Sequence, residues 1–179
     1  MISGQVDALL SLAYIIPGYI VYCIFAIILF STKSKEFKTP FYNLVKLLAI
    51  IDLSLIPMFF INNRLTQIRA FFPFFEDHKE PTWVITIWFY LCCIFQHSQF
   101  YVHVLIAFNR FSAIIMIGKY NLIWSKTCFR FMISAVFLIP AIYLSWLVVA
   151  GSMFREIVFP GYEAYVVDNV FLGPQIVSF

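Results

Sequence analysis

Four long apolar stretches, separated by shorter polar segments, organise this sequence. They cover residues 8–30, 41–61, 83–117 and 131–150. About 20 apolar residues in a helix cross the roughly 30 Å hydrocarbon core of a bilayer, so each stretch is long enough to span it. A helix from Trp83 to Arg110 would advance about 40 Å and place these two side chains at opposite membrane interfaces. The pattern predicts an all-α membrane protein with four transmembrane helices.

The first apolar stretch has the features of a retained helix and lacks those of a cleaved signal peptide. The residues before it include Asp7 and no Lys or Arg, so a positively charged leading region is missing. The apolar run is also longer than the usual 7–15 residues of a signal peptide. We therefore expect the chain to remain attached to the bilayer at its first helix.

Composition narrows the class of protein further. Hydrophobic residues make up 63% of the 179 residues and charged residues 12%, against about 45–50% and about 25% in ordinary soluble domains. These values exclude an ordinary soluble enzyme and a disordered chain. The sequence contains no phosphate-binding glycine loop, metalloprotease helix or nucleophile elbow, and no continuous basic face. We expect no enzymatic activity, no cofactor and no nucleic-acid partner.

The stretch after the fourth apolar segment, residues 151–179, differs from the rest of the chain. It carries scattered charges and the turn pairs Pro160-Gly161 and Gly173-Pro174. The pattern predicts an extracellular, loop-like stretch that includes at most a short strand or an interfacial helix. A fifth membrane span is not expected there.

The distribution of basic residues predicts the orientation in the membrane. Seven Lys and Arg residues lie in the first connector and in the end of the third apolar region with its connector, and four lie on the other side. The two sets are Lys33, Lys35, Lys38, Arg110, Lys119, Lys126 and Arg130, and Arg64, Arg69, Lys79 and Arg155. Because short cytoplasmic loops carry the excess of positive charge, we expect a multi-pass plasma-membrane protein with its N-terminus outside.

Asp52 lies near the middle of the second apolar stretch, where an ionisable group is costly. Such residues usually face other protein or trapped water and mark function. Asp52 can therefore be a polar pivot coupled to a conformational change. It can equally be a structural residue that is hydrogen-bonded to a neighbouring helix, and the sequence leaves both interpretations open.

The third apolar stretch carries the richest set of polar side chains. Gln96, Gln99, His103 and Arg110 follow at steps of three, four and seven, so they share one helix face. We expect this stripe to point into the bundle, where it would line a cavity above a switch at the cytoplasmic end. Interhelical hydrogen bonding is the simpler alternative for Gln96 and Gln99.

A metal site is not expected. Cys93 and His97 are spaced i and i+4 on the same predicted helix, but no third or fourth ligand is evident. The four cysteines also lack the spacing of a zinc site or a secreted disulfide framework.

Two short blocks resemble the nematode serpentine chemoreceptors of the gamma group or the neighbouring class V. The first is Phe108-Asn109-Arg110-Phe111-Ser112-Ala113-Ile114-Ile115 and the second is Lys119-Tyr120-Asn121-Leu122-Ile123-Trp124-Ser125-Lys126. Thr39-Pro40-Phe41-Tyr42 is similar to the start of the second helix in that family. The resemblance covers most of residues 10–150.

The resemblance implies a rhodopsin-like seven-helix receptor of which only the first four helices are present. Such a receptor binds an external small molecule and signals through a heterotrimeric G protein. Asn109, Arg110 and Phe111 would form the coupling switch, and Asp52 would take the place of the helix-two aspartate of rhodopsin-like receptors. Without the resemblance, Arg110 would be interpreted as an ordinary interfacial cation. On this basis we expect a chemosensory receptor in a truncated form.

Two other functions remain open from the sequence. One is a non-signalling four-helix adaptor or assembly subunit, which would co-purify with a second membrane protein. The other is half of a transporter, which would require inverted repeats and broken helices at matching positions. Pro17-Gly18 and Pro140 are too few to indicate such repeats.

Overall fold

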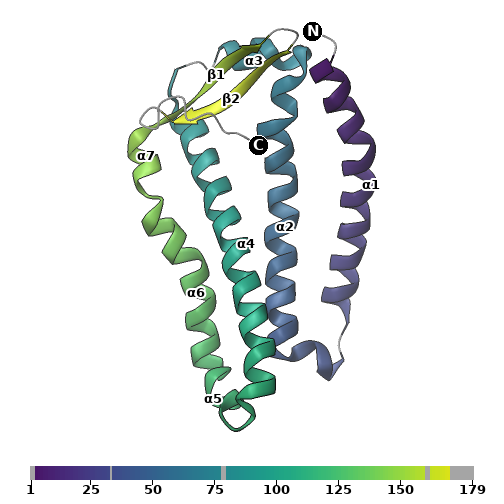
Figure 1. The fold of residues 1–179 in the computed structure, drawn as a ribbon, viewed down its shortest axis with the longest axis vertical. Helices are drawn as coiled ribbons and strands as arrows, with labels where there is room; N and C mark the ends of the chain where they lie inside the picture. The colour runs from purple at the N-terminus through teal and green to yellow at the C-terminus, as the bar shows by residue number, and fades with distance from the viewer. Residues whose placement is uncertain (1–2, 33, 78–79, 160–161, 170–179) are drawn as a thin grey trace. The chain divides into compact units, whose positions relative to one another are not determined.

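The computed structural model describes residues 3–32, 34–77, 80–159 and 162–169. These residues contain four helices long and apolar enough to cross a membrane, labelled in Figure 1. They are α1 (Ser3–Ser31), α2 (Pro40–Asn63), α4 (Trp83–Ile115) and α6 (Lys126–Tyr143), the last followed by α7 (Trp146–Ala150). The prediction of a mainly helical protein with four membrane-spanning helices is confirmed.

Short helical turns connect the long helices. They are η1 (Lys35–Lys38), η2 (Leu65–Gln67), η3 (Arg69–Phe71), α3 (Phe72–Glu76), η4 (Ile117–Lys119) and α5 (Tyr120–Ile123). Lys33 and Lys79, two of the basic residues used to predict the orientation, lie outside the described residues.

A proline accounts for where one of these helices begins, but not for where another ends. Pro40 opens α2, where its missing N–H would have no intrahelical partner. Pro140 lies inside α6, which ends three residues later at Tyr143, and α7 begins at Trp146. A proline removes one backbone hydrogen bond and crowds the turn that precedes it, so Pro140 does not account for a helix end that lies after it.

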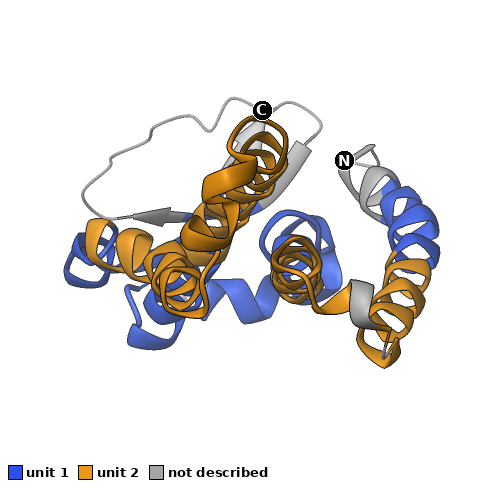
Figure 2. Ribbon diagram, turned by 90° about the horizontal axis from the view of Figure 1, so that it is seen from below, with its two compact units in different colours: residues 1–18, 56–93, 144–179 blue, residues 19–55, 94–143 orange. Residues whose placement is uncertain are grey.

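The chain divides into two compact units, which are coloured separately in Figure 2. Unit 1 comprises Met1–Gly18, Ile56–Cys93 and Leu144–Phe179. Unit 2 comprises Tyr19–Leu55 and Ile94–Tyr143.

Unit 1 contains an antiparallel β-hairpin. Strands β1 (Ser152–Phe159) and β2 (Tyr162–Asn169) pair with Phe154 opposite Val167. The stretch predicted to be loop-like thus forms two strands between residues 152 and 169, while residues 160–161 and 170–179 lie outside the described residues. It adds no fifth membrane-length helix within the described part of the chain.

An aromatic cluster holds the hairpin against the helical part of unit 1. Phe75, Ile85, Phe154 and Tyr165 are buried together, and the rings of Phe75 and Phe154 lie 4.7 Å apart between centroids. The backbone N–H of Ser152 also donates a hydrogen bond to the Thr86 hydroxyl on α4, at 2.9 Å. These contacts anchor the first strand at a defined place on its unit.

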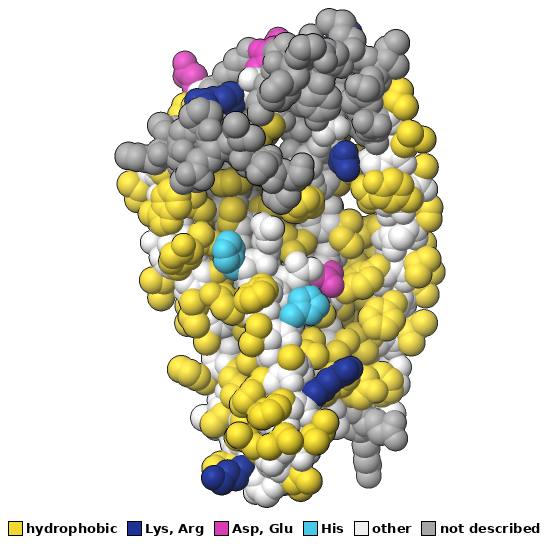
Figure 3. Space-filling view, viewed as in Figure 1, with side chains coloured by type: hydrophobic (Ala, Val, Ile, Leu, Met, Phe, Trp, Pro, Cys, Tyr) yellow, Lys and Arg dark blue, Asp and Glu magenta, His cyan; other side chains and the backbone are white. Residues whose placement is uncertain are grey.

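Unit 2 has a core of small and apolar residues from α1 and α2. Ala26, Leu29 and Ala49 are buried, and Leu53 packs against them. Lipid offers no hydrophobic force to drive membrane helices together, so their association depends on close packing. Small side chains allow two helices to approach closely enough for it. Much of the described helical surface is nevertheless apolar, as the yellow side chains in Figure 3 show. Exposed residues such as Ile142, at 73%, suit a lipid solvent.

Candidate functional site

Asp52 is the centre of a hydrogen-bonded network within unit 2. The Tyr22 hydroxyl on α1 donates to Asp52 Oδ2 at 2.6 Å. The Gln99 side-chain amide on α4 donates to Asp52 Oδ1 at 2.7 Å. The network therefore joins three helices through one carboxyl group.

The positions of these residues in their helices explain why they meet. Asp52 lies 12 residues after Pro40, the start of α2, which is about 18 Å along the helix axis and close to the middle of a bilayer. Tyr19 and Tyr22, three steps apart, share one face of α1. The Tyr19 hydroxyl donates to the Leu53 carbonyl at 3.2 Å, beside Asp52.

The geometry satisfies the carboxyl group without a second charged residue. Each of its oxygens accepts one short hydrogen bond, one from a phenol and one from an amide. A buried polar group in lipid must find its partners within the protein. Because both donors come from other helices, any relative movement of α1, α2 and α4 at this level must change at least one of these bonds.

The polar side chains of the predicted stripe on α4 differ in how far they are buried. Gln96 and His103 are exposed, whereas Gln99 is half-buried and bonded to Asp52. The structure therefore brings Gln99 to Asp52 and leaves Gln96 and His103 on the surface of the helix. Among the described residues, no group of three His, Cys, Asp or Glu side chains could hold a metal ion.

A second hydrogen-bonded cluster lies where α4 ends and the chain turns through η4 and α5. We call this turn, residues 109–124, the α4 corner. Asn109 is buried, at 3% exposure, and its side-chain amide donates to the Tyr120 hydroxyl at 3.2 Å. The Trp124 indole N–H donates to Ser112 Oγ at 2.8 Å, and the Ser112 hydroxyl donates to the Asn109 carbonyl at 3.0 Å. The loop that follows α4 is thereby tied back to its last turns.

Arg110 and Phe111 project from this corner. Phe111 is 51% exposed, and Arg110 is also exposed. The Arg110 guanidinium carbon lies 5.1 Å from the centre of the Phe41 ring at the start of α2, a distance at which the ring face attracts a cation. The buried neighbour Asn109 holds the turn, while Arg110 and Phe111 present a cation and an aromatic ring outside it.

Sequence reasoning found Asp52, Gln99 and Asn109 but not the residues that complete their networks. Tyr22 is one of ten tyrosines in the chain, and no local pattern marks it as the partner of an aspartate 30 residues away. Ser112 and Trp124 did stand in the two blocks that carry the family resemblance. Their presence in these two blocks, on either side of the loop after α4, was the available indication that the loop is bonded back to the helix.

Replacing Trp124 with Phe should loosen this corner. The change removes the indole N–H and leaves Ser112 Oγ without the bond it accepts, so we expect a loss of about 0.5–1.5 kcal/mol in the free energy of unfolding. Hydrogen exchange of the amides between residues 116 and 125, measured in detergent micelles, should become faster. Trp83→Phe is the matched control, because Trp83 is 75% exposed. Equal exchange rates in both variants would show that the indole bond does not hold the loop.

A family model described as Srg family chemoreceptor matches residues 8–170. No curated protein matches the chain significantly.

Proposed function

The chain belongs to the Srg family of chemoreceptors, and from that premise we propose that it is a G-protein-coupled chemosensory receptor. The family match covers more than nine-tenths of the sequence and confirms the resemblance to the gamma group. It is the observation that carries the proposal. The four membrane-length helices make the chain an integral membrane protein.

The corner at the end of α4 supports a role for Arg110 in coupling. A guanidinium has five N–H donors and stays charged, so it can bind backbone carbonyls or carboxylates of a protein partner. Its exposure leaves it accessible, and the Asn109, Ser112 and Trp124 bonds fix the backbone from which it projects. We propose that Arg110 and Phe111 contact the G protein and that the buried Asn109 is a positioning residue for this coupling switch.

The Asp52 network supports a role in passing the effect of ligand binding from one helix to another. A ligand changes the state of a receptor only by binding one conformation better than another. We propose that the two conformations differ in how α1, α2 and α4 meet at Asp52, since its two hydrogen bonds depend on all three helices. Gln96 and His103 lie on the same helix as Gln99, and their exposed side chains are available to a ligand. We propose that they line the cavity that takes an external small molecule.

The proposed orientation places the N-terminus outside and the α4 corner in the cytoplasm of a plasma membrane. The excess of basic residues in the first and third connectors supports it. An epitope tag at the N-terminus should be stained by antibody in intact cells. A tag at Lys119 should require permeabilisation.

Coupling is tested directly with the full-length protein in cultured cells. Resonance energy transfer between Gα and Gβγ subunits would report nucleotide exchange for each class of Gα, with and without a panel of small organic odorants. We expect one Gα class to respond above mock-transfected cells. No response in any class, despite confirmed surface staining, would contradict the proposal.

A further inference from the structure

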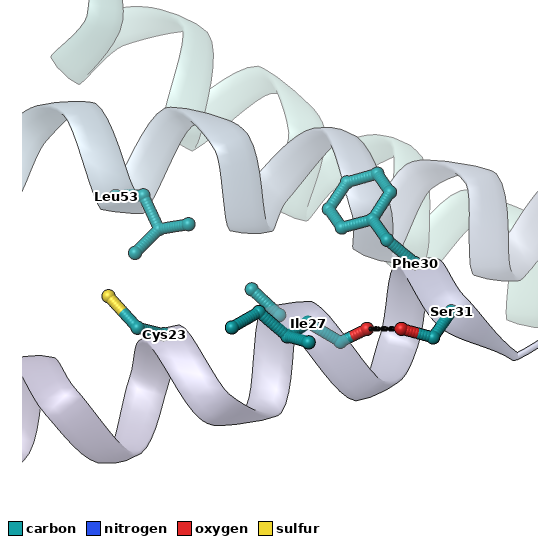
Figure 4. A pocket seen from close by; sticks show the side chains of 6 residues that line it. Cys23, Ile27, Phe30, Ser31 and Leu53 are labelled. Atoms are coloured by element: carbon teal, nitrogen blue, oxygen red, sulfur yellow. Dashed lines mark hydrogen bonds between the residues drawn. The ribbon is translucent and has the colours of Figure 1, made fainter.

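An open apolar groove lies between α1 and α2 within unit 2 (Figure 4). Its lining residues are Cys23, Ala26, Ile27, Phe30, Ser31 and Leu53. In Figure 4 the Cys23 thiol points towards Leu53 on the facing helix, and Phe30 lies at the other end. The volume of about 560 Å³ is within the range of small-molecule sites, about 300–1,000 Å³.

A cation lies next to Phe30, where the groove ends. The Lys46 ammonium on α2 is 6.0 Å from the centre of the Phe30 ring. It also donates a hydrogen bond to the Phe37 carbonyl at 3.3 Å. Lys46 and Leu53 are seven residues apart, so they share the face of α2 that carries the groove wall.

The groove and the cation lie at different depths in the membrane. Cys23 is within the apolar span Leu9–Ser31 and is eight residues, about 12 Å, from its last residue, Ser31. Phe30 and Ser31 close that span, and Lys46 is in the second turn of α2, whose span begins at Pro40. The groove therefore extends from the hydrocarbon region to the interface, where a lysine reaches the headgroup level.

We propose that this groove binds one acyl chain of an anionic phospholipid whose phosphate pairs with Lys46. An ammonium has three N–H donors, and among the described residues one of them is directed to the Phe37 carbonyl. The remaining donors can bind a phosphate oxygen as charge-assisted hydrogen bonds. A sterol would fill the apolar groove without using the charge, and a zwitterionic lipid would gain less from it.

The site does not depend on the proposed signalling activity. It uses only contacts between α1, α2 and the turn η1 in unit 2, and it predicts a lipid preference that exists with or without a G protein. Basic residues near an anionic leaflet contribute a lipid preference of about fivefold each. That preference is the quantity to measure.

The test uses the full-length protein in detergent, with lipid binding followed by native mass spectrometry. Phosphatidylserine and phosphatidylcholine with identical acyl chains are added separately at equal concentrations. We expect phosphatidylserine to bind about fivefold more tightly to the wild type. Lys46→Gln should abolish this preference, and Lys46→Arg should keep it. Lys38→Gln is the matched control, since Lys38 is an exposed cation in the same connector and its loss should change the preference by less than about twofold.

The apolar part of the site is tested separately. Cys23→Phe fills the groove and should weaken binding of both lipids without changing their ratio, provided that the variant keeps the melting temperature of the wild type. Cys23→Leu, a smaller change, should have a smaller effect in the same direction. Glycerol 3-phosphate, which has the anion without acyl chains, should not displace the bound lipid.

Three results would overturn the proposal. Equal affinity of the wild type for the two lipids would remove the role of Lys46. Equal effects of Lys46→Gln and Lys38→Gln would indicate a diffuse charge effect of the connector. Displacement of phosphatidylserine by cholesterol, with Lys46→Gln without effect, would identify an apolar sterol site.

Discussion

Substitution of Arg110 by Ala should reduce G-protein coupling by about 30-fold or more while leaving surface expression close to that of the wild type. Arginines at the centre of protein interfaces are frequent hot spots, and truncating one costs about 2 kcal/mol or more. Arg110 is exposed at the end of α4, so its removal creates no cavity in the core. Energy transfer between Gα and Gβγ measures coupling, and antibody staining of intact cells measures expression.

Two further variants separate a coupling contact from a general charge effect. Arg130→Ala on α6 removes an exposed cation from the same unit and should change coupling by less than about twofold. Phe41→Leu removes the ring that lies under the Arg110 guanidinium, and an exposed cation–π contact of about 0.5–1 kcal/mol predicts a change of about two- to fivefold. Equal losses in Arg110→Ala and Arg130→Ala would reduce Arg110 to an ordinary interfacial cation.

The membrane helices could be predicted from hydropathy because lipid imposes a length and an apolar surface on each of them. The third prediction, residues 83–117, agrees closely with α4 at Trp83–Ile115. The fourth, residues 131–150, begins five residues after α6 does at Lys126. Hydropathy measures the part of a helix that lies in hydrocarbon. It therefore excludes Lys126 and Arg130, although both belong to the helical first turns.

The β-hairpin could not be predicted in the same way. Its anchors are contacts between residues that are distant in the sequence, such as Phe75 with Phe154 and Tyr165. Each strand alone carries only a short mixed pattern of apolar and charged residues. Aromatic partners on α3 make the hairpin stable where it lies, and a two-stranded hairpin without such packing is marginal in water.

Two residues of the Asp52 network, Asp52 and Gln99, could be predicted because polar side chains are rare in membrane helices. Asp52 is conspicuous because a carboxyl group is costly at mid-membrane depth, and the periodicity of α4 singled out Gln99 as one of a small polar set. Their pairing depends on how α2 and α4 pack, which a periodicity does not contain. Tyr22 was not found because its ring is apolar enough to be unremarkable in a membrane helix.

Removal of the Asp52 carboxyl group should produce the largest loss of stability at this site. In Asp52→Ala the Tyr22 hydroxyl and the Gln99 amide lose their acceptors, and single interhelical hydrogen bonds in membranes average about 0.6 kcal/mol with a maximum of about 1.7. We expect a loss of about 1–3 kcal/mol in the free energy of unfolding. Asp52→Asn should cost less than about 1 kcal/mol, because the new amide can accept from Gln99 and donate to the Tyr22 oxygen.

Double-mutant cycles distinguish a connected network from two unrelated losses. Unfolding in detergent mixtures is measured for Asp52→Ala, Gln99→Ala and the double variant, and likewise with Tyr22→Phe. Coupling energies of about 0.5 kcal/mol or more are expected in both cycles. Once Asp52→Ala has removed a hydrogen bond, the second substitution cannot remove the same bond again. Ser54→Ala is the control, since its hydroxyl bonds the Ile50 carbonyl of its own helix. Additivity within about 0.3 kcal/mol in both cycles would mean that Asp52 does not join the three helices, and the proposed pivot would lose its physical basis.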